Sequence, residues 1–227
     1  YINNNENSNL FSGKSLRLGG SKKLYENNNH FFVDLSAILI DNLHIRAEMT
    51  SPPNNKISLM NKWDEKIEAI IKNTINENVT SLAGVPSWML TLLNNVLIHT
   101  KKTNISEIWS NLEVYFHGGV NFNPYKQEFK KILPSNIHFY ETYNASEGFF
   151  ALQDQNNSED LLLMLDYCIY YEFLEMNNSE IISDIPINLS DVKKGVNYAI
   201  IISTNSGLWR YKIGDTIKFT SLNPFRI

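Results

Sequence analysis

The chain has 227 residues, of which 43% are hydrophobic and 12% aromatic, and its formal net charge is −4. This composition is typical of a folded protein with a sizeable core, and it excludes a disordered chain. The mild acidity and the lack of a basic stripe interleaved with aromatic residues argue against nucleic acid as the main partner. The single cysteine, Cys168, excludes an internal disulfide framework and indicates a reducing compartment, so we expect a cytoplasmic protein.

No stretch approaches the roughly 20 consecutive apolar residues that a membrane helix needs, so no membrane association is expected. The first residues also lack the basic and then apolar pattern of a secretory signal. The chain starts at Tyr1 rather than at a methionine and breaks off at Ile227. We therefore expect an internal fragment of a longer protein.

Strands and helices alternate along the first part of the chain. A short strand is expected over 16–18, and the apolar run over 31–43 fits either a helix or a strand. Apolar residues recur at spacings of three and four over 58–76, which predicts an amphipathic helix. The expected elements after it are a strand over 79–83, a helix from Pro86, a strand over 112–116, a helix over 123–133 and a strand over 137–143. The helix from Pro86 is expected to bury a face formed by Trp88, Leu92, Val96 and His99.

This alternation predicts an α/β fold with a parallel-rich sheet layer, covered by helices, over about residues 1–150. After Phe149 the pattern changes to short apolar segments joined by turns, which predicts a mostly antiparallel β region over about residues 151–227. Both portions are expected to belong to one domain. The strands of the second portion are expected over 161–165, 169–174, 198–203, 208–213 and 216–220.

Three segments carry residues that are typical of a ligand site. Residues 143–147 (Tyr-Asn-Ala-Ser-Glu) place a phenol, a hydroxyl and a carboxylate within five positions at the end of a predicted strand. Residues 117–119 (His-Gly-Gly) end the preceding strand, and a Gly-Asp turn at 214–215 ends a later one. Ligands of open α/β sheets bind beyond the carboxyl ends of the strands. The aromatic segment over 166–173, which contains one internal acid, is a further candidate, although it also fits simple core packing. Each segment alone fits an ordinary structural role, but together, in this order, they favour a ligand site.

Other site classes are not supported. Gly13-Lys14-Ser15 lacks the glycine that a phosphate loop needs five positions earlier, where Ser8 stands. Five scattered histidines and one cysteine cannot build a structural zinc site. No Gly-x-Ser-x-Gly nucleophile elbow is present.

The motifs resemble those of the Gretchen Hagen family of acyl acid–amido synthetases, within the adenylate-forming enzymes. Residues 143–147 match the superfamily's Tyr-x-x-Ser/Thr-Glu motif, and positions 144 and 145 depart from the plant pattern Tyr-Ala-Ser-Ser-Glu. The family's Tyr-Arg-Val-Gly-Asp appears as residues 211–215, and its Tyr-Phe-Glu-Phe strand as residues 170–173. Residues 84–88 (Gly-Val-Pro-Ser-Trp) and the Gly118-Gly119 turn look like those of bacterial members.

The resemblance implies that the chain is part of the large N-terminal domain of an adenylate-forming enzyme. The family's phosphate loop would lie upstream and its small C-terminal domain downstream, so we expect the isolated chain to have negligible activity. The implied reaction is ATP-dependent activation of a small carboxylic acid as its acyl-adenylate. Attack by an amine, such as an amino acid, would then give an amide.

By this resemblance Tyr143 would stack on adenine through its flat apolar face. Ser146 would donate to the α-phosphate, where charge builds during attack by the acid. Glu147 would hold Mg²⁺, a hard cation that prefers carboxylate oxygen.

The resemblance assigns five further residues. Asp215 would accept the ribose hydroxyls, and Gly118 and Gly119 would let the base or the acyl group approach the main chain. Trp88 and His117 would contribute to the acyl pocket.

Two alternatives remain open at this point. The first is an adenylate-forming ligase that passes the acyl group to a thiol such as coenzyme A, because the acceptor contacts would lie partly outside this chain. The second is a non-catalytic nucleotide or small-ligand binding module on the same fold.

Overall fold

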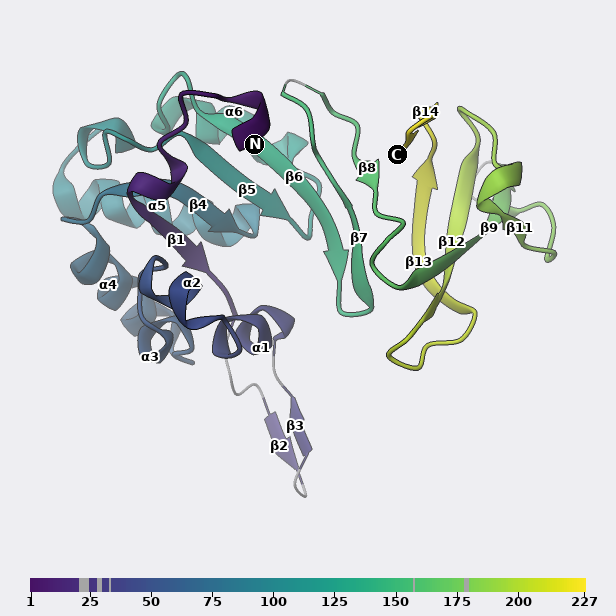
Figure 1. The fold of residues 1–227 in the computed structure, drawn as a ribbon. Helices are drawn as coiled ribbons and strands as arrows, with labels where there is room; N and C mark the ends of the chain where they lie inside the picture. Colours follow the sequence, from purple (N-terminus) through teal and green to yellow (C-terminus); the bar gives the residue numbers. More distant parts are fainter. Residues whose placement is uncertain (21–24, 28–29, 33, 157, 178–179) are drawn as a thin grey trace. The chain divides into compact units, whose positions relative to one another are not determined.

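The computed structural model describes residues 1–20, 25–27, 30–32, 34–156, 158–177 and 180–227. The chain divides into two compact units, Tyr1–Tyr140 and Glu141–Ile227 (Figure 1). Within the described part of the chain, no helix combines the length and the apolar character needed to cross a membrane.

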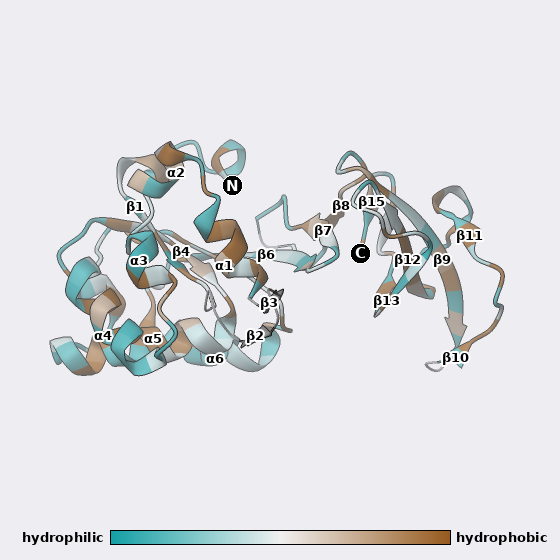
Figure 2. Cartoon of the chain, turned by 90° about the horizontal axis from the view of Figure 1, so that it is seen from below, coloured by the Kyte–Doolittle hydropathy of each residue, from teal (hydrophilic) through white to brown (hydrophobic). Residues whose placement is uncertain are grey.

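The first unit is built on a parallel sheet in the order β1-β4-β5. Helices α4, α5 and α6 lie on one side of this sheet and the N-terminal segment lies on the other (Figures 1 and 2). The strands of this unit are β1 (Lys14–Leu18), β2 (Tyr25–Asn27), β3 (His30–Phe32), β4 (Val79–Gly84) and β5 (Val114–Gly118). Its helices are α1 (Leu35–Asp41), α2 (Ile45–Met49), α3 (Asn55–Ser58), α4 (Trp63–Thr74), α5 (Pro86–Thr100) and α6 (Asn123–Ile132), with 3-10 turns η1 (Ile2–Asn4), η2 (Leu10–Ser12) and η3 (Ile105–Glu107).

The core of the first unit lies between the sheet and the three helices. Alternate strand residues, Leu16, Leu82 and Tyr115, point toward the helices and are fully buried. The predicted parallel sheet covered by helices is therefore confirmed. The part of the apolar run at 31–43 that follows Asp34 forms α1, whereas residue 33 lies outside the described residues.

Helix α5 begins at Pro86, as expected, because proline suits the first helical position. The predicted buried face is wrong by part of a turn: Leu92 and Val96 are buried, but Trp88 is half-buried and His99 is exposed. The buried face of α5 is wider than a single row of residues spaced three or four apart. That face consists of Met89, Leu92, Leu93, Val96 and Leu97.

Helix α4 carries a buried lysine. The residue Lys66 is 1% exposed, and its Nζ donates to the carbonyl oxygens of Gly19 at 2.6 Å and Gly20 at 3.2 Å. Burial lowers the pKa of Lys66 to about 8, with the Asp34 carboxylate acting in the opposite direction. The ammonium group thereby ties α4 to the turn that follows β1.

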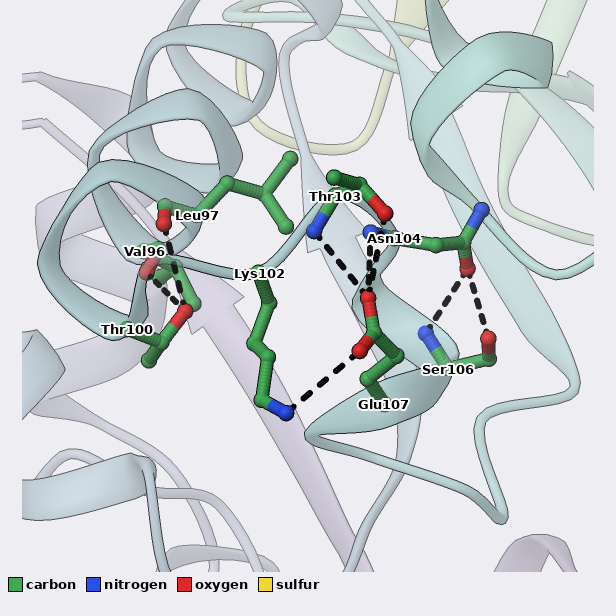
Figure 3. A network of polar contacts seen from close by, with 8 residues as sticks. All are labelled: Val96, Leu97, Thr100, Lys102, Thr103, Asn104, Ser106 and Glu107. Atoms are coloured by element: carbon green, nitrogen blue, oxygen red, sulfur yellow. Dashed lines mark hydrogen bonds and ion pairs between the residues drawn. The ribbon is translucent and has the colours of Figure 1, made fainter.

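A capping box starts the 3-10 turn η3 (Figure 3). Asn104 Oδ1 accepts from Ser106 N at 2.9 Å, and Glu107 Oε1 accepts from Asn104 N at 3.2 Å. Main-chain donors at Thr103 and Asn104 lower the pKa of the Glu107 carboxyl group. Asn104 Nδ2 also donates to Leu133 O at 3.2 Å, which fixes the end of α6 against this turn.

The strands of the second unit lie in two sheets, and the strand pairs described within this unit are antiparallel. The first has the order β6-β7-β8-β15-β14, and the second β10-β9-β12-β13 with β11 beside β9. Phe150, Phe173 and Phe219 are fully buried in its core. The strands are β6 (His138–Ala145), which begins in the first unit, β7 (Gly148–Leu152), β8 (Leu162–Leu163), β9 (Ile169–Asn177), β10 (Glu180–Ile181), β11 (Ile187–Asn188), β12 (Asn197–Thr204), β13 (Tyr211–Lys218), β14 (Ser221–Leu222) and β15 (Phe225–Arg226), with a 3-10 turn η4 (Leu189–Asp191).

The antiparallel region expected from the sequence is confirmed, with one correction. Residues 208–213 and 216–220 were expected to form two strands separated by a Gly-Asp turn. They contribute instead to one strand, β13, which pairs with β12 along its length. Ala199 pairs with Thr216 but Ile201 pairs with Lys212, so β13 contains extra residues that bulge out of the ladder.

Replacing Asn104 with Ala is expected to destabilise the protein by about 1 kcal/mol, because the amide nitrogen atoms at the start of η3 lose their acceptor. The matched control is Asn73→Ala: Asn73 is an exposed residue inside α4, where alanine is the better helix former. Urea unfolding of both variants measures the difference. Equal midpoints for the two variants would contradict a role for the capping box.

Candidate nucleotide site

The Tyr143–Glu147 motif lies at the tip of the β6–β7 hairpin. Tyr143 belongs to β6, and Ser146 and Glu147 form the two-residue turn between Ala145 and Gly148, which face each other across the hairpin. Ser146 is exposed and Glu147 is partly exposed. The hydroxyl and the carboxylate are therefore presented at a turn, where a ligand can reach them.

Tyr143 contacts Asp215, a second residue of this unit that was predicted to bind the nucleotide. Its phenol oxygen donates to Asp215 Oδ2 at 2.6 Å, across 72 positions of sequence, and its ring lies 5.0 Å from that of Phe150. Burial raises the pKa of Tyr143 well above its ordinary value, and the hydrogen bond to Asp215 raises it further. The phenol consequently stays protonated at neutral pH and acts as the donor.

Asp215 lies in the bulge of β13, directly after Gly214. Gly214 has a φ of +101°, a conformation that side chains with a Cβ rarely adopt. The bulge leaves Asp215 exposed, and among the described residues its second carboxylate oxygen, Oδ1, has no hydrogen-bond partner. Asp215 therefore keeps an acceptor for a ligand hydroxyl while it holds Tyr143.

One contact near the site was not predicted from the sequence. Arg210, which has a φ of +47°, makes two hydrogen bonds of 3.0 Å to the carboxylate of Glu172 on β9. This bidentate pair fixes the start of β13, the strand that carries Asp215. Glu172 is the one acid of the aromatic segment over 166–173 that lies within β9. An acid inside an apolar strand requires a polar partner, but the sequence does not show which residue supplies it.

The remaining predicted site residues lie in the first unit. Gly118 is the last residue of β5, and Gly119 follows it with a φ of +83°. His117 is 3% exposed, and its ring stacks on that of Phe122 at 3.9 Å. Burial lowers the pKa of His117 to about 4, with Lys126 acting in the same direction, so it is neutral at physiological pH.

Trp88, the other residue predicted for the acyl pocket, is half-buried at the start of α5. Its ring centroid lies 5.8 Å from that of Trp63 on α4. Trp88 and His117 both pack on the helix-covered side of the sheet, and their role in acyl binding stays a prediction.

Two family models match most of the chain. The GH3 family N-terminal domain matches residues 8–137, and the GH3 family central domain matches residues 162–226. The chain belongs to the GH3 family. The resemblance inferred from the motifs is thus confirmed.

Several curated GH3 proteins are similar in sequence. The indole-3-acetic acid-amido synthetase GH3.10 of Arabidopsis thaliana is 31% identical over 107 residues, which are 46% of this chain and 15% of that protein. The jasmonoyl–L-amino acid synthetase JAR4 of Nicotiana attenuata is 32% identical over 82 residues, 34% of this chain and 14% of its own length. The indole-3-acetic acid-amido synthetase GH3.4 of Arabidopsis thaliana is 25% identical over 187 residues, 73% of this chain and 31% of that protein. The chain thus spans less than a third of the length of these relatives.

Two solved structures share the fold. The GH3.15 acyl acid amido synthetase superposes with a TM-score of 0.78 over 96% of this chain and 48% of that chain, at 15% identity. A 2-hydroxyisobutyryl-CoA ligase in an open conformation superposes with a TM-score of 0.57 over 94% of this chain and 43% of that chain, at 14% identity. The GH3 chain therefore shares the fold of part of these two proteins, which confirms the predicted fold class.

Replacing Asp215 with Ala is expected to lower the pKa of Tyr143, because the phenol loses both its acceptor and the neighbouring negative charge. The pKa should stay above the ordinary value of about 10, since burial remains. A pH titration of tyrosine Cζ signals by NMR, with Tyr143→Phe identifying the signal, measures the change. Asp184→Ala, an exposed acid of the same unit, serves as the control. An unchanged Tyr143 pKa in Asp215→Ala would contradict the contact.

Proposed function

We propose that this GH3-family protein uses ATP to activate a small carboxylic acid and transfers the acyl group to an amine, foremost an amino acid, to form an amide. The relatives in sequence named above are two indole-3-acetic acid-amido synthetases and a jasmonoyl–L-amino acid synthetase. The observation that carries the proposal is the hydrogen bond between Tyr143 and Asp215, because it joins the two nucleotide motifs of the sequence.

In the first half-reaction, a carboxylate oxygen of the acid attacks the α-phosphorus of ATP, and pyrophosphate leaves. In the second, the nitrogen of the amine attacks the acyl carbon, AMP leaves, and the nitrogen loses a proton. Each residue of the site has a role in the first step.

Tyr143 and Asp215 are suited to hold the nucleoside. The Tyr143 ring offers an apolar face on which adenine stacks. Asp215 Oδ1 is an acceptor for the ribose hydroxyls, while Oδ2 keeps the tyrosine in place. Both groups are held before the nucleotide arrives, so less ordering is needed on binding.

Ser146 and Glu147 are suited to the phosphates. The Ser146 hydroxyl would donate to the α-phosphate as negative charge builds there. No three metal-ligating side chains gather within the described residues, so a Mg²⁺ ion here would take the Glu147 carboxylate together with phosphate and water oxygens. That set fits the ligand preference of Mg²⁺, which would supply charge neutralisation at the phosphates.

The remaining four residues have proposed roles in the approach of the ligand to the main chain and in the acyl pocket. Gly118 and Gly119 leave the end of β5 without side chains, which would let the base or the acyl group approach the main chain. Trp88 and His117 would contribute apolar surface to the acyl pocket.

ATP–pyrophosphate exchange by the full-length protein, over a panel of carboxylic acids, tests the activation step. Exchange is expected with at least one acid, and product analysis with amino acids and coenzyme A as acceptors should show the amide rather than the thioester. A folded protein that exchanges with no acid would contradict activation chemistry, and a thioester as the main product would contradict amide formation.

Within that assay Ser146→Ala is expected to slow exchange by about 100-fold or more, since one donor to the developing charge is lost. Glu147→Gln is expected to suppress exchange because the amide is a poor Mg²⁺ ligand. Glu180→Gln, an exposed acid on β10, is the matched control and should leave the rate unchanged. A wild-type rate in Glu147→Gln would remove Glu147 from the metal site.

A further inference from the structure

The sheet of the first unit has a second face, opposite helices α4, α5 and α6. Because strand residues alternate, Arg17, Ala83 and Phe116 point to this face, whereas Leu16, Leu82 and Tyr115 point to the helices. The N-terminal segment lies on this side of the sheet (Figure 2).

A cavity of about 280 Å³ lies on this second face. Leu10 of η2 is held there because Thr80 Oγ1 donates to its carbonyl oxygen at 2.8 Å. Thr50, another lining residue, is held to β1 because Ser15 N donates to its carbonyl oxygen at 2.8 Å. One side-chain and one main-chain hydrogen bond thus hold two of the segments that line the cavity. Its lining residues, all in the first unit, are Leu10, Phe11, Gly13, Ser15, Arg17, Thr50, Ser81, Ala83 and Phe116.

Arg17 is the only charged residue of this lining. It is half-buried, and its guanidinium group makes neither a hydrogen bond nor an ion pair with any residue that the structure describes. Burial lowers the pKa of Arg17, and no acid offsets this effect. The two arginines of the second unit differ: Arg210 and Arg226 each hold a carboxylate, of Glu172 and Asp154, through two hydrogen bonds.

The rest of the lining specifies the kind of anion. Phe11 and Phe116 supply aromatic surface, with Leu10 and Ala83 beside them. Ser15 and Ser81 add hydroxyl groups, and neither hydroxyl has a hydrogen-bond partner among the described residues. A guanidinium group matches a carboxylate in geometry and pairs with it through two parallel hydrogen bonds. Apolar walls favour a ligand whose remaining surface is apolar.

We propose that this cavity binds a small organic acid, with its carboxylate on Arg17 and its apolar body between Phe11 and Phe116. The volume limits the ligand to a compact acid, such as one with a single aromatic ring. None of the lining residues belongs to the nucleotide site proposed above. The inference concerns binding alone and does not rest on the proposed activity.

Calorimetric titration of the full chain with benzoate tests the proposal, with benzamide as an uncharged ligand of similar shape. Benzoate is expected to bind at least about tenfold more tightly than benzamide, because only benzoate pairs with the guanidinium group. Equal affinities, or no benzoate binding at millimolar concentration, would overturn the proposal. Inorganic phosphate is expected to compete poorly, and displacement of benzoate at equal concentration would contradict the role of the apolar walls.

Two variants locate the site. Arg17→Gln should weaken benzoate binding at least about tenfold and leave benzamide unaffected. The control is Lys72→Gln, an exposed cation on α4 that pairs with Glu68. Ala83→Leu fills the cavity and keeps Arg17, so it should abolish binding of both ligands. Wild-type benzoate affinity in either folded variant would place the site elsewhere.

Discussion

The hydrogen bond between Tyr143 and Asp215 joins the two sheets of the second unit, since Tyr143 lies in β6 and Asp215 in β13. Burial keeps the phenol protonated, so the contact lasts throughout the physiological pH range. The Phe150 ring packs against the tyrosine ring at a tilt, and the Glu172–Arg210 pair fixes the start of β13. The proposed nucleotide site depends on this contact because it brings the motifs of two sheets together before any ligand binds.

Several cationic side chains of this protein are matched with oxygen atoms: Lys66 and Arg226 are buried, and Arg210 is exposed. Lys66 donates to two main-chain carbonyl groups after β1. Arg210 and Arg226 each hold a carboxylate. Leaving a buried cation unmatched costs free energy, because water is removed and nothing replaces it. Arg17 departs from this pattern, and for that reason an anionic ligand is the simplest account of its cavity.

Much of the fold could be predicted because it depends on local sequence. Pro86 sets the start of α5, and the apolar period of α4 requires no knowledge of distant residues. The continuity of β13 could not be predicted in this way, because its pairing with β12 outweighs the turn preference of a Gly-Asp pair. The nucleotide motifs were identified through their resemblance to those of a known family. The pairing of Arg210 with Glu172 and the cavity around Arg17 both depend on segments far apart in the chain, so no local sequence pattern predicts them.

We propose that Tyr143, Ser146, Glu147 and Asp215 form one nucleotide site. A crystal structure of the full-length protein with ATP and Mg²⁺ would show where the nucleotide binds. We expect adenine against the Tyr143 ring, the ribose hydroxyls within hydrogen-bond distance of Asp215, and the phosphates at the 146–147 turn. A nucleotide bound away from Asp215, or a Tyr143–Asp215 pair left untouched by the bound nucleotide, would contradict this proposal.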